Sequence, residues 1–146
     1  MKSEPSSYSI DDLERDTRTP WEGVRNYQAR NFMRDDMRVG DRVFFYHSAC
    51  ASPGITGLAR VCSRAYPDPT ARKRGGKYYD PKASDADPRW YLVDVCFVRK
   101  LETSLTLKDM RKDPKLADLL LLRRGNRLSV LPVAEKEGVY LWQCLS

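Results

Sequence analysis

Aromatic, basic and amide side chains are concentrated in residues 21–34, which read WEGVRNYQARNFMR. Arginine contacts phosphate groups, asparagine and glutamine hydrogen-bond to base edges, and aromatic rings stack on a base taken out of its helix. Trp21, Arg25, Asn26 and Tyr27 supply all three kinds of side chain. This combination favours nucleic-acid binding, and the alternative is that Trp21 is an ordinary core residue.

More residues of these kinds are spread along the chain, and only the fold can bring them together. They are Ser3, Tyr46, His47, Ser48, Trp90 and Arg127. The run ARKRGGK at residues 71–77 adds a cluster of cations that suits phosphate contacts. For Trp90 the alternative is again a core aromatic, and for residues 71–77 it is a solvated basic loop.

Other chemistries find little support. His47 is the one histidine, and although Ser48 and Cys50 are near it, nothing marks the third, orienting group of a nucleophilic site. A hydrogen-bonded residue at a strand end is the favoured interpretation of His47. No segment matches a phosphate-binding glycine motif. The acidic pairs at residues 11–12 and 35–36 lie at expected helix ends, where solvated acids are common.

The cysteine pattern predicts neither a metal site nor disulfides. Cys50, Cys62, Cys96 and Cys144 include no CxxC pair, and one histidine cannot complete a zinc site of the usual spacing. We therefore expect no metal or cofactor, and buried free thiols in a reducing compartment.

The composition of the chain sets further bounds. Its 146 residues fit one domain spanning residues 1–146. With 26 basic and 20 acidic residues the net charge is +6, which permits a polyanionic partner without requiring one. No apolar run approaches the ~20 residues of a membrane span. We expect a protein without a membrane partner, monomeric, and cytoplasmic, or nuclear in a eukaryote.

Secondary-structure patterns predict short strands interrupted by helices. Expected helices lie at residues 9–14, 24–33, 107–111 and from 113 onward, and expected strands at 41–47, 54–66, 89–100, 127–133 and 138–145. Gly57 inside a strand predicts a bulge or a close approach to the backbone, and residues 67–88 a long loop. This order predicts an α+β fold with a small, mostly antiparallel, curled β-barrel.

Long motifs in this chain resemble those of the EVE domain. They are MKSEP, WEGVRNYQARNFMR, MRVGDRVFFYHS, PGITGLARV, AYPDPT, YYDPK, PRWYLVDV and RLSVLPV. The resemblance implies a PUA-like fold, in which helices surround a small curled barrel. It also implies a reader of modified bases, chiefly modified cytosine in DNA, with a flipped nucleotide in the pocket. EVE sequences usually carry a few apolar residues before MKSEP, so we expect a shortened first strand or a start upstream of Met1.

The resemblance extends to YTH domains, which bind N6-methyladenine in RNA through an aromatic cage, so RNA is a second possible ligand. It implies cage or base-edge roles for Ser3, Trp21 and Trp90. The full candidate base pocket is Ser3, Trp21, Val24, Asn26, Tyr27, Tyr46, His47, Ser48, Trp90, Arg127 and Ser129. The candidate phosphate contacts are Lys2, Arg25, Arg30, Arg34, Arg72, Lys73, Arg74 and Lys77.

We expect binding without catalysis. The alternative is a small hydrolase acting on modified nucleosides, because some relatives in the wider PUA-like group, the ASCH domains, resemble amidohydrolases. Lys2 and Glu4 are the candidate catalytic residues for that alternative.

Overall fold

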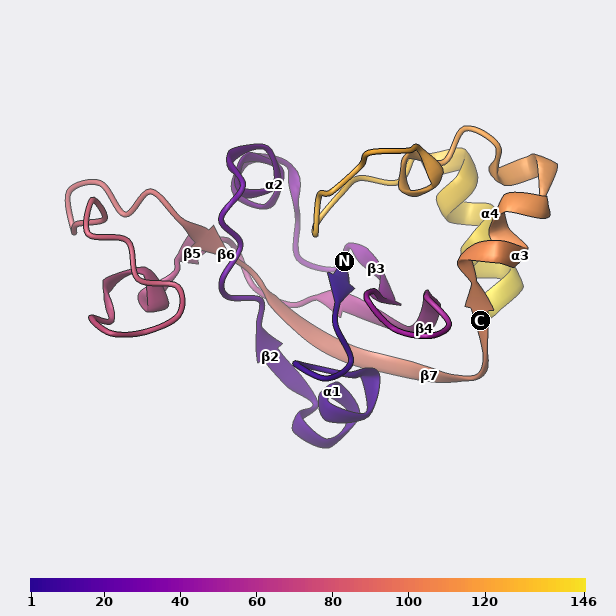
Figure 1. Cartoon of the computed structure of the whole chain (residues 1–146), viewed down its shortest axis with the longest axis horizontal. Coiled ribbons are helices and arrows are strands. Elements are labelled where there is room, and N and C mark those ends of the chain that lie inside the picture. The colour runs from indigo at the N-terminus through magenta and orange to yellow at the C-terminus, as the bar shows by residue number, and fades with distance from the viewer.

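A curled, five-stranded mixed sheet forms the centre of the molecule in the computed structural model, which covers all 146 residues (Figure 1). The strands lie in the order β1-β3-β4-β7-β2. Their bounds are Lys2–Ser3 for β1, Arg18–Pro20 for β2, Arg42–His47 for β3, Gly54–Val61 for β4 and Asp94–Thr106 for β7. Only the β1–β3 pair is parallel. The α+β class and the mostly antiparallel, curled sheet predicted from the sequence are confirmed.

Four α-helices surround this sheet. Their bounds are Ile10–Asp16 for α1, Tyr27–Asn31 for α2, Leu107–Lys112 for α3 and Glu135–Leu145 for α4. A π-helical turn, Phe32–Asp36, continues α2. Ser9 caps α1 by a reciprocal pair of hydrogen bonds with Asp12. A Cβ atom on Gly57 of β4 would overlap the Ile10 side chain, so this glycine lets α1 pack closely against the sheet, as the sequence predicts.

A long segment, residues 66–92, leaves the main sheet between β4 and β7 and is called the excursion below. It begins with β5, Tyr66–Pro67, which pairs with β6, Tyr91–Leu92, in a separate two-stranded ribbon. Between them, a short 3₁₀ turn at Pro69–Arg72 is followed by irregular chain, which projects from one end of the molecule in Figure 1. The predicted strand at residues 89–100 is therefore divided, and Trp90 precedes β6 instead of lying on the main sheet.

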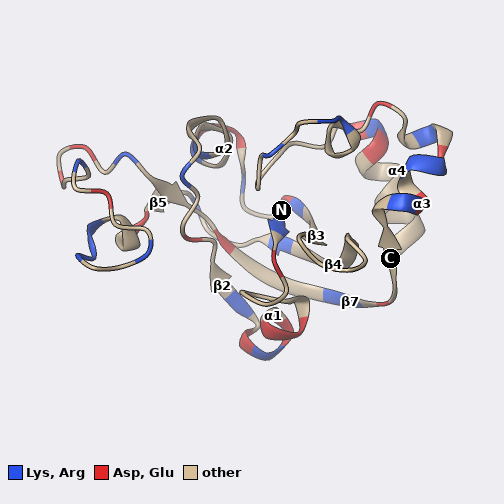
Figure 2. Cartoon of the chain, viewed as in Figure 1, with Lys and Arg blue, Asp and Glu red and all other residues tan.

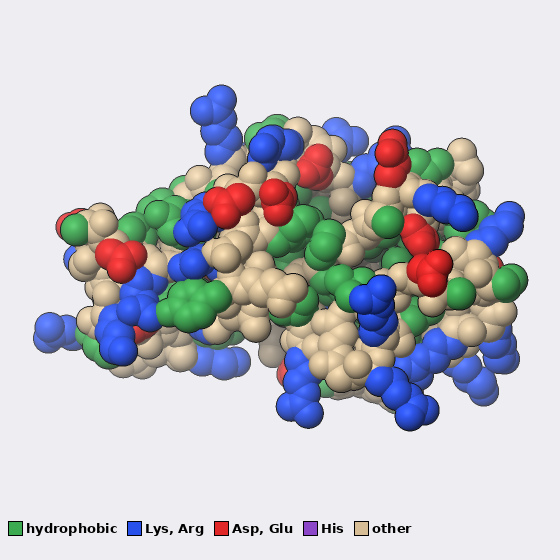
Figure 3. Space-filling model, turned by 90° about the horizontal axis from the view of Figure 1, so that it is seen from above, with side chains coloured by type: hydrophobic (Ala, Val, Ile, Leu, Met, Phe, Trp, Pro, Cys, Tyr) green, Lys and Arg blue, Asp and Glu red, His purple; other side chains and the backbone are tan.

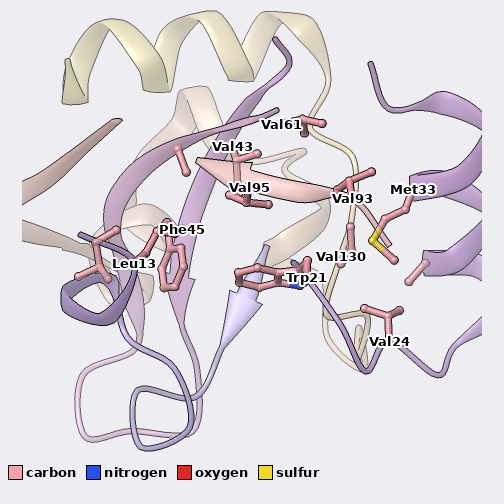
Figure 4. Packing of buried hydrophobic residues seen from close by; sticks show 13 residues of the cluster. Leu13, Trp21, Val24, Met33, Val43, Phe45, Val61, Val93, Val95 and Val130 are labelled. Carbon is pink, nitrogen blue, oxygen red and sulfur yellow. The ribbon is translucent and has the colours of Figure 1, made fainter. Parts of the chain in front are cut away.

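The apolar side chains form two clusters. The first joins α1, the connection at residues 21–26 between β2 and α2 (the Trp21 turn) and the α2 region to one face of the sheet. Figure 4 shows Trp21 lying among Phe45, Val93 and Val130. The second lies toward the C-terminal helices; its buried members are Tyr46, Ile55, Leu58, Leu101, Met110, Leu116, Leu119 and Leu141. The first cluster positions the pocket described below.

The C-terminal third of the chain differs from its prediction. Residues 127–133 form no strand, and residues 138–145 belong to helix α4. Leu141 and Leu145 are four residues apart and both pack on the second cluster, a spacing that suits a helix. The helix predicted at 24–33 begins later, at Tyr27, because the Asn26 side chain caps it by accepting a hydrogen bond from Ala29 N.

The cysteine prediction is also wrong in part. Cys62 and Cys96 form a disulfide, with Cα atoms 6.0 Å apart. Cys62 follows β4 and Cys96 lies on the neighbouring strand β7, so strand pairing brings together residues that are 34 positions apart. Cys50 is free and half-buried, and Cys144 is free and exposed.

Candidate nucleic-acid interface

A pocket of about 410 Å³ lies where the N-terminal segment meets the Trp21 turn and the tip of the excursion. This volume is in the range of small-ligand sites. Its lining residues are Lys2, Ser3, Glu4, Ser7, Tyr8, Thr19, Pro20, Trp21, Glu22, Gly23, Val24, Lys77, Tyr78 and Ser129. The pocket therefore combines aromatic rings with hydroxyl groups, two carboxylates and two amines.

Trp21 belongs both to the core and to the pocket. Its backbone N–H donates to the Val93 carbonyl at 2.9 Å, which extends the β2–β7 pairing by one residue. Its indole ring meets Phe45 edge-on at 5.6 Å between centroids, and the residue is 8% exposed. Figure 4 shows this arrangement. Trp21 is thus held rigidly by the core while one part of it contributes to the pocket wall.

Tyr78 forms a second aromatic part of the wall. The chain passes close to its ring at Gly23, where φ is +86° and a Cβ atom would overlap the ring. Both the positive φ and the close approach require glycine at position 23. Arg25 donates to the Tyr78 carbonyl from Nε at 3.1 Å and from Nη2 at 2.8 Å. These contacts fasten the excursion to the Trp21 turn.

A buried carboxylate, Asp68, organises that junction. It accepts hydrogen bonds from Gly23 N at 2.9 Å, Arg25 Nη1 at 3.0 Å and both the N–H and the hydroxyl of Thr70. Burial by itself raises the pKa of Asp68, but the hydrogen bonds from Gly23, Thr70 and Arg25 outweigh it, and the pKa is lowered. Asp68 is therefore charged at neutral pH and holds the turn and the excursion together.

Trp90 lies outside the pocket. Its ring stacks on Tyr27 at 4.8 Å and 19°, and the Arg25 guanidinium lies 5.3 Å from its centroid. The indole Nε1 donates to Asp80 Oδ2 at 2.7 Å, and the residue is 5% exposed. Since Arg25 also lies 5.5 Å from the Tyr78 ring, Trp90 supports the pocket wall through Arg25.

The remaining candidate base-pocket residues divide into two groups. Ser3, Val24 and Ser129 line the pocket. Asn26 caps α2, Tyr46 lies in the second core cluster, the Ser48 N–H donates to the Ser3 carbonyl, and Arg127 is exposed. His47 is a helix-capping acceptor, because its Nε2 receives the Ile10 N–H at 3.1 Å.

The candidate phosphate contacts divide in the same way. Lys2 and Lys77 line the pocket, and Lys73 and Arg74 are exposed beside Lys77 without an acidic partner. Three others pair with acids: Arg25 with Asp68, Arg34 with Asp35 and Arg72 with Asp85. Arg30 donates to the Arg89 carbonyl and lies 4.7 Å from the Tyr27 ring.

Sequence reasoning missed Asp68, Tyr78 and Asp80. All three occur in motifs that carry the family resemblance, AYPDPT and YYDPK, but a long loop offers no periodicity from which to assign roles. The two motifs are the one sequence feature that could have pointed to these residues.

The structure brings no three metal-ligating side chains together. None of the helices has both the length and the apolar character that crossing a membrane requires.

The His47 contact predicts a pH dependence of folding. Burial lowers the pKa of His47 below 6.5, against a smaller opposite effect of Asp11. As the pH falls, the unfolded chain therefore binds this proton first. The stabilisation is complete above pH 6.5 and is lost as the pH drops further.

We expect the free energy of unfolding, measured by urea titration at about pH 7.5 and about pH 5.5, to fall less in His47→Gln than in the wild type. Other groups titrate in both proteins, so the difference between the two pH dependences isolates His47. Identical pH dependences would show that His47 is not held neutral by the fold.

The sheet topology, the surrounding helices and the pocket at the N-terminal edge define a PUA-like α+β domain. The chain matches the EVE domain over residues 1–144 and belongs to that family.

Relatives support this assignment. Human thymocyte nuclear protein 1 is 39% identical over 156 residues, covering 94% of this chain and 68% of the human protein. The uncharacterized protein C21.03c of Schizosaccharomyces pombe is 42% identical over 123 residues, covering 83% of this chain and 51% of its own length.

Solved structures agree with the fold. A hypothetical protein from Leishmania major superposes with a TM-score of 0.91 at 46% identity, covering 99% of this chain and 90% of that one. Human THYN1 protein in complex with 5-methylcytosine-containing DNA superposes with a TM-score of 0.89 at 36% identity, covering 99% and 94%.

Proposed function

We propose that this domain binds DNA and holds a modified cytosine in the pocket walled by Trp21 and Tyr78. The observation that carries the proposal is the pocket itself, in which a core-anchored indole lies beside hydroxyl groups and carboxylates. The related human protein crystallised with 5-methylcytosine-containing DNA supports the choice of ligand.

The pocket chemistry suits an extruded cytosine. A base taken out of the duplex can stack on an aromatic ring and expose its hydrogen-bonding edge. Carboxylates accept from the cytosine N4 amino group, and Glu4 and Glu22 are the two carboxylates of the pocket. Lys77 and the neighbouring exposed Lys73 and Arg74 supply cations that can contact backbone phosphates beside the pocket.

The proposed role is binding without catalysis. Lys2 and Glu4, the residues that a hydrolase would need, both line the pocket. Burial lowers the pKa of Lys2, but no side-chain hydrogen bond or ion pair orients either group. General acid–base chemistry depends on such positioning. Incubation with modified nucleosides, followed by chromatography, should yield no product; a product would favour the hydrolase.

We expect selective binding of oligonucleotides that carry a modified cytosine. Fluorescence anisotropy titrations should compare matched DNA and RNA oligonucleotides containing cytosine, 5-methylcytosine or N6-methyladenine. DNA containing 5-methylcytosine should bind most tightly, because contacts to the 5-methyl group are not available to plain cytosine. Equal affinity for all members, plain bases included, would contradict the proposal.

A further inference from the structure

The segment 123–129 presents three arginines on a braced turn. Asn126 N donates to the Arg123 carbonyl at 3.4 Å, and Gly125 between them has φ +77°. The Asn126 side chain fixes both ends of the turn, donating to the Leu120 carbonyl and accepting from Leu128 N, each at 3.0 Å. Arg123, Arg124 and Arg127 are therefore carried by an ordered loop.

These arginines have no acidic partner. Arg123, Arg124 and Arg127 are exposed, and none forms an ion pair. Lys73 and Arg74 are also exposed and form no ion pair, whereas Arg25 and Arg89 pair with Asp68 and Asp80. Free cations on a surface are the groups that can neutralise phosphates.

The two sets of free cations belong to segments that border the same pocket. Ser129, two residues after Arg127, lines it from one segment, and its carbonyl accepts from Lys2 N at 2.7 Å. Lys77 and Tyr78 line it from the excursion. Figure 2 shows Lys and Arg on both segments, and Figure 3 shows basic side chains spread over the face that is seen from above.

We propose that Arg123, Arg124 and Arg127 form a second phosphate-binding arm, so that DNA backbone is held on both sides of the nucleotide in the pocket. The proposal rests on the proposed function. An extruded nucleotide keeps a phosphate on each side, and holding both flanks fixes it over the pocket. Loop 71–77 supplies one flank, and the arginine arm supplies the other.

The salt dependence of DNA binding tests the arm. Each phosphate that the protein neutralises adds about −0.9 to the slope of log affinity against log salt for duplex DNA. Removing one such cation should therefore make the gain in affinity between about 1 M and about 0.1 M salt roughly 8-fold smaller. The triple variant Arg123→Ala/Arg124→Ala/Arg127→Ala should reduce the magnitude of the slope by about 1 to 3. The ratio of affinities for methylated and plain DNA should stay unchanged.

A matched control removes the same charge elsewhere. Lys108→Ala/Lys112→Ala/Lys136→Ala changes three exposed lysines of α3 and α4 that do not line the pocket. Its slope should stay close to that of the wild type, and thermal melting should show both variants folded. An unchanged slope in the arginine variant, or an equal reduction in the lysine control, would overturn the arm. Absence of preference for methylated DNA in the wild type would instead contradict the proposed function, while the slopes still test the arm.

Discussion

The Trp21→Ala variant is expected to bind DNA carrying 5-methylcytosine roughly 5- to 150-fold more weakly than the wild type, because base stacking on an aromatic ring contributes about 1–3 kcal/mol. The same change should lower the free energy of unfolding by about 3–5 kcal/mol, since Trp21 is 8% exposed and packs on Phe45. Affinity is measured on the folded fraction by anisotropy, and stability by urea titration.

Two further variants separate stacking from packing. Trp21→Phe keeps a ring in the pocket and should retain more affinity than the alanine variant. Trp90→Ala removes an equally buried indole that does not line the pocket, so its loss in stability should be comparable and its loss in affinity smaller. If the folded fraction of Trp21→Ala binds as tightly as the wild type, Trp21 is structural only.

Asp68→Asn should destabilise the protein by about 3 kcal/mol, because it removes the buried charge that faces the half-buried Arg25 guanidinium and replaces an accepting oxygen by an amide NH2 group. Asp68 is 3% exposed and accepts from Gly23, Thr70 and Arg25 at once. Urea unfolding at neutral pH measures the effect. Asp85→Asn, which removes the exposed partner of Arg72, is the control and should change stability little.

The pH dependence gives a second measure of the same interaction. Because the pKa of Asp68 is lowered from 3.8, its stabilisation is complete above that pH and is lost as the pH falls through the folded-state pKa. Asp68→Asn should therefore lose less stability than the wild type on acidification below about pH 4. A variant as stable as the wild type at neutral pH would show that the Asp68 hydrogen bonds do not hold the excursion.

Local sequence patterns are sufficient to predict several elements and the class of fold. The first helix, expected at residues 9–14, and the close approach at Gly57 follow from local rules, and both are found in the structure. Predictions of this kind use only residues that are close together in the sequence. The family resemblance also rests on contiguous motifs, and the match to the EVE domain over residues 1–144 confirms it.

The choice of aromatic rings that meet in the pocket depends instead on long-range contacts. Trp21 and Trp90 look alike in sequence, but one lines the pocket and the other lies behind Arg25. That difference arises because Asp68, 45 residues beyond Gly23, folds the excursion back and places Tyr78 against the turn. Hydrogen bonds to a buried carboxylate have no periodicity along the chain, so spacing cannot reveal them.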